Sequence, residues 1–120
     1  MLQTGTNYKI SQEKRRKYPP NIAYYDASAR QSAYELKEGL VKLFRSHHIQ
    51  SRELVIMCIG SDRSTGDSLG PLIGYKLEKF HIPGISVRGT LSEPVHAANL
   101  AENLELINSS YRHPFVLAVE

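Results

Sequence analysis

The fold of this chain is decided by residues 54–71, which read LVIMCIGSDRSTGDSLGP. The first six residues are apolar without alternation, which is typical of a strand buried on both faces of a parallel sheet. Gly60 ends this strand, and the polar residues 61–67 form a loop. The apolar spacing after the loop predicts a helix over about 68–80. Pro71 falls in the first turn of that helix, where proline is tolerated.

The chain on either side of this stretch alternates between helical and strand patterns. Apolar residues at spacings of three and four predict helices over about 28–47 and 94–107, and apolar residues predict strands over 85–90 and 115–119. Such alternation of helices and strands predicts a three-layer α/β/α sandwich with a mainly parallel sheet. The strand over 85–90 alternates in polarity, which places it nearer an edge of the sheet.

Each predicted helix has a set of candidate core residues. These are Ala33, Leu36, Leu40, Leu43 and Phe44 in the first helix, Leu69, Leu72, Ile73, Leu77 and Phe80 in the second, and Val95, Ala98, Leu100, Leu104 and Ile107 in the third. Asp26 or Ser28 is expected to cap the first helix. Cys58 lies within the buried strand and is expected to be a core residue rather than a nucleophile.

The composition restricts the class of protein. A length of 120 residues suits one domain, and 41% hydrophobic residues can build a core. The single cysteine excludes an internal disulfide and fits a reducing, cytoplasmic setting. No apolar run has the length of a membrane span, and the N-terminus lacks the apolar segment of a secretory signal.

The net charge of +3 is concentrated near the N-terminus. The charged residues of positions 1–17 are Lys9, Glu13, Lys14, Arg15, Arg16 and Lys17. Their net charge is +4, so the remaining residues have a net charge of −1. We therefore expect a basic, extended tail over residues 1–25, followed by the α/β domain over 26–120. Such a tail is most often a solvated terminus, which disfavours nucleic acid as a partner.

Ionisable residues follow the carboxyl ends of the predicted strands, where open parallel sheets bind ligands. Asp67 and Glu120 can share a proton there or hold a divalent metal ion. Alternatively, Asp67 caps the following helix, or the loop binds phosphate, which its two aspartates oppose. Glu93 and His96 can line the same cleft, with His96 transferring a proton. In the alternative, Ser92 or Glu93 starts the third helix and His96 is a surface residue.

Three segments, CIGSDRSTGDSLGP at 58–71, GTLSEPVHA at 89–97 and PFVLAV at 114–119, carry a family resemblance. They resemble the sporulation protein YyaC family of spore-forming Firmicutes. That family is similar to the spore germination protease and, more distantly, to hydrogenase maturation proteases. The resemblance therefore implies a phosphorylase/hydrolase-like α/β/α fold and peptide-bond hydrolysis.

By this resemblance, Asp67 matches the catalytic loop carboxylate of the germination protease, and Glu120 stands where the relatives usually have Asp. The residues expected to bind substrate are Gly60, Asp62, Arg63, Ser64, Thr65, Glu93 and His96, with Arg63 suited to a substrate carboxylate. The relatives continue with further strands and helices, so the chain resembles a C-terminally truncated domain. The histidine of the nickel-binding relatives lies in that further part, so no metal triad carries over and no resident cofactor is expected.

Two functions follow as expectations. The first is a sporulation-associated peptidase that uses paired strand-end carboxylates on a peptide or protein substrate, in the cytoplasm of the sporulating cell or forespore. The alternative is a catalytically inactive member of the same fold that binds a peptide or protein, which the replacement of Asp by Glu120 favours. The apolar strand over 115–119 is expected to pair with another chain, so the isolated chain is predicted to be dimeric, aggregated or unstable.

Overall fold

The computed structural model describes residues 22–61, 63 and 65–120, which fall into two compact units that divide between His48 and Ile49. The basic residues of the predicted tail lie outside the described residues. Within those residues, no helix is both long and apolar enough to cross a membrane.

The first unit contains the helix α2, Ser32–Ser46. The expected helix over 28–47 begins four residues later because Asp26 and Ser28 form a separate turn. The backbone N–H and the hydroxyl of Ser28 both donate to Oδ1 of Asp26, at 2.9 and 2.6 Å, and these hydrogen bonds hold the pKa of Asp26 below its ordinary value. Gln31 occupies the N-cap without a side-chain hydrogen bond, so the expected cap by Asp26 or Ser28 is wrong.

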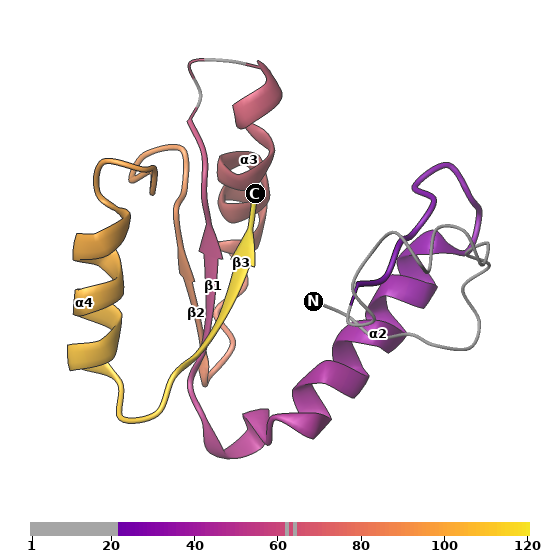
Figure 1. The fold of residues 1–120 in the computed structure, drawn as a ribbon, viewed down its shortest axis with the longest axis horizontal. Coiled ribbons are helices and arrows are strands. Elements are labelled where there is room, and N and C mark those ends of the chain that lie inside the picture. Colours follow the sequence, from indigo (N-terminus) through magenta and orange to yellow (C-terminus); the bar gives the residue numbers. More distant parts are fainter. Residues whose placement is uncertain (1–21, 62, 64) are drawn as a thin grey trace. The chain divides into compact units, whose positions relative to one another are not determined.

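The second unit is built on a parallel sheet of three strands in the order β2-β1-β3 (Figure 1). The strands are β1, Leu54–Cys58, β2, Ile85–Arg88, and β3, Phe115–Val119. Leu54 of β1 pairs with Ile85 of β2 and with Phe115 of β3. The buried central strand, the parallel pairing and the edge position of β2 within this sheet confirm the predicted α/β class.

Two helices cover opposite faces of the sheet, α3, Leu69–Leu77, and α4, Leu100–Ser110. Alternate side chains of a strand point to opposite faces. Val55 and Met57 pack with Ile107 of α4 in the core, whereas the Cβ atom of Cys58 faces Gly74 of α3. The second unit is therefore a helix–sheet–helix sandwich, as Figure 1 shows.

The expected core face of α3 is wrong in part, since Ile73 and Leu77 are half-buried but the other large residues are exposed. Leu69 and Phe80 are 57% and 58% exposed, and the buried residues of the helix are Gly70, Pro71 and Gly74. The glycines bring the backbone of the helix close to the backbone at the strand ends. A Cβ atom on Gly74 would overlap the carbonyl oxygen of Gly89, and one on Gly70 would overlap that of Ile59.

The third helix begins six residues later than expected. Residues 94–99 form a loop, and Val95 is buried because it pairs as an isolated parallel bridge with Ile59, just beyond β1. Ile107 is fully buried as expected, but Ala98 is exposed and Leu104 is 37% exposed. Val95 was thus correctly expected in the core, although it belongs to a strand-like contact and not to the helix.

Candidate functional site

The carboxyl edge of the sheet brings Glu120 to the same side as the loop after β1. Cys58 and Val119 are register partners, and the N–H of Ile59 donates to the carbonyl of Val119 at 2.7 Å. Glu120 follows directly. The start of β3 is fixed by Arg52, whose guanidinium donates to the carbonyls of His113 and Pro114 at 3.1 and 2.9 Å. The predicted adjacency of the two acid-bearing strand ends is confirmed.

The loop after β1 returns to the end of the strand from which it starts. Gly60 has φ +153°, and a Cβ atom there would overlap the carbonyl oxygen of Asp67. The N–H of Ser61 donates to the same carbonyl at 2.8 Å. Only glycine fits this close approach. The loop therefore returns Asp67 to the strand end, where the 3₁₀ turn Thr65–Asp67 leads into α3.

The carboxylates of Asp67 and Glu120 are exposed at this edge. Ser68, and not Asp67, is the N-cap residue of α3, and its side chain makes no cap hydrogen bond. The alternative that Asp67 caps the helix is therefore wrong. Sharing of a proton between Asp67 and Glu120 stays a prediction.

The other residues expected in this loop are placed in part. Arg63 is exposed, and its backbone N–H donates to Oγ of Ser61 at 3.1 Å. Thr65 opens the 3₁₀ turn, while Asp62 and Ser64 lie outside the described residues. Among the residues that are described, no three His, Cys, Asp or Glu side chains are grouped closely enough to hold a metal ion.

The segment that contains Glu93 begins with a compact turn. The N–H of Glu93 donates to Oγ1 of the buried Thr90, and the N–H of Thr90 donates to the carbonyl of Glu93, both at 3.1 Å. Ser92 lies within this turn, with its hydroxyl 3.1 Å from that of Thr90. The alternative that Ser92 or Glu93 starts the helix is therefore wrong.

Asn99 holds His96 in place, and the sequence interpretation missed it. Oδ1 of Asn99 accepts the N–H of His96 at 2.8 Å, and Nδ2 donates to the carbonyl of Pro94 at 3.0 Å. Asn99 is also the N-cap residue of α4. Asparagine favours that position, which is the sequence signal that could have located the start of the helix.

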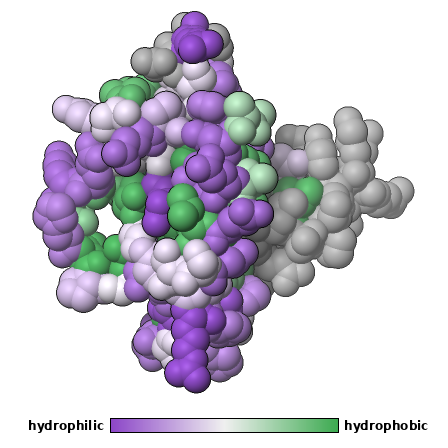
Figure 2. Space-filling model, turned by 90° about the vertical axis from the view of Figure 1, so that its left-hand side faces the viewer, coloured by the Kyte–Doolittle hydropathy of each residue, from purple (hydrophilic) through white to green (hydrophobic). Residues whose placement is uncertain are grey.

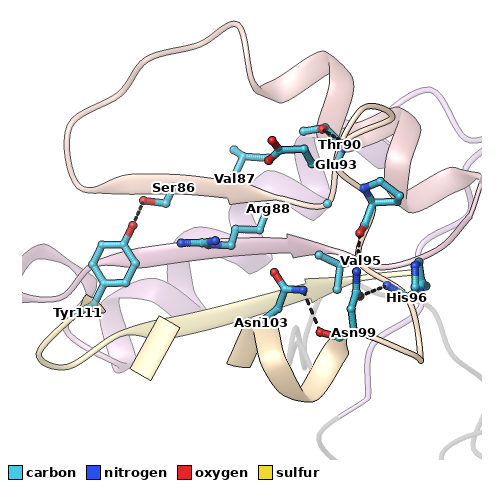
Figure 3. A pocket seen from close by; sticks show the side chains of 12 residues that line it. Ser86, Val87, Arg88, Thr90, Glu93, Val95, His96, Asn99, Asn103 and Tyr111 are labelled. Atoms are coloured by element: carbon cyan, nitrogen blue, oxygen red, sulfur yellow. Dashed lines mark hydrogen bonds between the residues drawn. The ribbon is translucent and has the colours of Figure 1, made fainter. Parts of the chain in front are cut away.

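A cleft of about 560 Å³ lies between β2, the segment after it and α4 (Figure 3). Glu93 and His96 both line this cleft, but Asp67 and Glu120 do not, so their expected sharing of one cleft with the two carboxylates stays a prediction. Val95 also lines it, and its carbonyl accepts the N–H of Gly60 at 2.8 Å. This bond joins the cleft wall to the Asp67 loop. Further polar lining residues that the sequence interpretation missed are Ser86, Arg88, Asn103 and Tyr111. Figure 2 views the second unit from the side of α4, where hydrophilic residues predominate and hydrophobic residues are visible between them.

A short polar network occupies one end of the cleft. The hydroxyl of Ser86 donates to Oε2 of Glu53 at 3.0 Å and lies 2.8 Å from the hydroxyl of Tyr111. The geometry lets the Tyr111 hydroxyl donate to Ser86, which in turn donates to Glu53. The network thus ties the end of α4 to the edge strand β2 and to the residue before β1.

The parallel α/β unit, the folded-back acidic loop and the polar cleft define a small α/β protein with a candidate site at the carboxyl edge of its sheet. The chain belongs to the family described as "Protein of unknown function (DUF1256)", which matches residues 22–120. It is 40% identical over 110 residues to the uncharacterized protein YyaC of Bacillus subtilis (strain 168).

That alignment covers 92% of this chain and 50% of the relative, so the chain spans about half the length of the curated relative it matches. No solved structure matches the chain. The resemblance to the YyaC family is thereby confirmed, and neither the family nor this relative is described by an activity.

Proposed function

We propose that this chain carries the acid-bearing part of a sporulation-associated peptidase that acts in the cytoplasm of the sporulating cell or forespore. One observation carries the proposal: the parallel pairing of β1 and β3 places the Asp67 loop and Glu120 at the same edge of the sheet. The tight turn at Gly60 supports it, since the turn returns Asp67 to the strand end. The resemblance to the germination protease supplies the reaction class.

The proposed reaction uses the two carboxyl groups in opposite protonation states. One carboxylate removes a proton from water, and the water oxygen forms a bond to the peptide carbonyl carbon. The other, protonated, carboxyl group donates its proton to the amide nitrogen as the carbon–nitrogen bond breaks. A pair in which one group is protonated and the other ionised meets this requirement.

The test is hydrolysis of a peptide library by the whole chain, followed by mass spectrometry. Asp67→Asn is expected to lower the rate by at least about 100-fold, since a positioned acid or base contributes factors of this order. Asp26→Asn, which changes the same residue type outside the second unit, is the matched control and is expected to leave the rate unchanged. Equal rates for wild type and Asp67→Asn would remove Asp67 from the mechanism.

A specific observation favours a second candidate, a non-catalytic module that binds a peptide or protein. Asp67 and Glu120 are both exposed, whereas catalytic carboxylates are commonly perturbed by burial or by close charges. Glu120 also carries one methylene more than the Asp of the relatives, and a displacement of an ångström disturbs a positioned pair. Peptide binding without turnover, equal in wild type and Asp67→Asn, would select this function.

A further inference from the structure

The cleft between β2 and α4 is polar where a helix that covers a sheet normally buries apolar side chains. Ser86 and Arg88 of β2 pair with Val55 and Met57 of β1, so all four side chains point to the same face of the sheet. Figure 3 shows Asn103 of α4 on the opposite wall of the cleft. An open volume therefore remains between β2 and α4, because their side chains do not interlock there.

Arg88 is the central charge of this cleft. It is half-buried and is the only Lys or Arg among the residues that line the cleft. Over residues 22–61, 63 and 65–120, no hydrogen bond or ion pair engages its guanidinium group. An arginine stays charged at all physiological pH values, and a partly buried charge is stabilised by a partner.

In the described part of the chain, neither of the two acidic groups near Arg88 forms an ion pair with it. Glu93 extends on the other side of the β2 ribbon from Arg88 in Figure 3. Glu53 accepts the hydrogen bond of the Ser86 hydroxyl at the far end of the cleft. Both nevertheless add negative charge to the surroundings, and this charge opposes a doubly charged ligand more strongly than a singly charged one.

We propose that the cleft between β2 and α4 binds a carboxylate group, which accepts two parallel hydrogen bonds from the guanidinium of Arg88. The planar guanidinium fork matches a carboxylate, and one cation balances one negative charge. The cleft wall joins the Gly60 loop through the bond to Val95, so a peptide whose terminal carboxylate sits on Arg88 reaches the edge that carries Asp67. The inference deepens the proposed function, on which the choice of a peptide as ligand rests.

The test compares two probes, acetyl-trialanine with a free carboxylate and the same peptide as its C-terminal amide. Both are titrated into the whole chain and followed by amide NMR shifts. The free carboxylate is expected to bind at least tenfold more tightly than the amide. Arg88→Met is expected to abolish this preference. Arg112→Met, a change at an exposed arginine that is absent from the cleft lining, is expected to keep it.

Equal affinity for the two peptides, or a preference that survives in Arg88→Met, would overturn the carboxylate site. If Arg88→Met fails to fold by circular dichroism, Arg88→Lys keeps the charge without the fork. Arg88→Lys is expected to weaken binding of the free peptide at least threefold, and unchanged affinity would overturn the proposal. Inorganic phosphate that binds more tightly than the free peptide would also overturn it.

Turnover separates this inference from the proposed function. Asp67→Asn is expected to keep the preference for the free carboxylate, because Asp67 does not line the cleft. Binding that depends on Arg88 in a chain without hydrolytic activity would leave the carboxylate site standing and reject the peptidase. Hydrolysis without binding that depends on Arg88 would leave the peptidase standing and reject the carboxylate site.

Discussion

The two faces of the central strand β1 are packed in different ways. On the α3 face, glycines let the helix backbone approach the backbone of the strand ends. Gly74, for example, lies close to the carbonyl of Gly89. On the α4 face, side chains such as Ile107 form a core beside a polar cleft. The α3 face therefore fixes the position of the strand ends, while the α4 face provides volume and hydrogen-bonding groups for a ligand.

The difference has a consequence for the candidate site. The loop with Asp67 and the segment with His96 both begin at strand ends that contact α3 through backbone. A substitution on the α3 face is therefore expected to disturb the whole edge. A substitution on the α4 face is expected to act locally, because side chains that border an open cleft can adjust their rotamers.

The largest effect is expected from Gly74→Ala on the α3 face. In a helix with open space, alanine in place of glycine raises stability by about 1 kcal/mol. At Gly74 the new Cβ atom overlaps the backbone of Gly89, so the free energy of unfolding is expected to fall by about 3 kcal/mol or more. Urea denaturation followed by circular dichroism measures both the sign and the size.

Gly66→Ala is the matched control, since nothing lies within 4 Å of the position of its new Cβ atom. Its effect on the free energy of unfolding is expected to stay within about 1 kcal/mol. An increase in stability in Gly74→Ala would show that α3 stands away from β2, and the contrast between the two faces would then be lost.

A smaller and more local effect is expected from Asn99→Ala on the α4 face. This change removes the side-chain hydrogen bonds to His96 and Pro94, and losses of this kind cost about 1–2 kcal/mol. Thermal and urea denaturation measure the loss, and amide NMR shifts report whether the change is confined to residues 94–99.

Asn108→Ala, an exposed substitution of the same type on α4, is the control and is expected to change stability by about 0.5 kcal/mol or less. If Asn99→Ala matched this control, the Asn99 side chain would not be what holds the wall of the cleft. NMR shifts that spread to β1 and β3 would contradict the local character of this face.

The strands could be predicted from the sequence because their signal is strong and independent of neighbours. A continuous apolar run such as 54–59 can be stabilised only by burial on both faces, and the run over 115–119 has the same bounds as β3. The polar alternation of residues 85–90 likewise indicated the edge. Parallel pairing then followed from the intervening helices.

The packing of the helices could not be predicted from periodicity. Leu69 and Leu72 recur at helical spacing, but the face that contacts the sheet is set by Gly70 and Gly74, whose small size gives no apolar signal. Val95 is buried because it pairs with Ile59 as in a strand, and helical spacing cannot predict such a pairing.

The candidate site was predictable only where strand order determined it. The adjacency of the loop after β1 and Glu120 followed from the order of elements. Arg88 was missed because alternation along β2 places its side chain on one face but does not reveal a cavity there. The cavity depends on which side chains α4 presents, including Asn103, and hence on where α4 begins.

The smallest expected effect concerns Cys58, whose thiol is buried beside Gly74 on the α3 face. Burial raises the pKa of this thiol because the thiolate loses hydration. The thiol of the unfolded chain therefore ionises first as the pH rises. The contribution of Cys58 to stability is complete below about pH 8.5 and is lost as the pH rises toward the pKa of the folded state.

The difference in unfolding free energy between wild type and Cys58→Ala is expected to be constant up to about pH 8 and then to shift against wild type. Urea denaturation between about pH 7 and 10 measures it, and taking the difference removes titrations common to both proteins. A constant difference across this range would mean that water reaches the thiol, and the α3 face would then lack the closed backbone contact that distinguishes it from the α4 face.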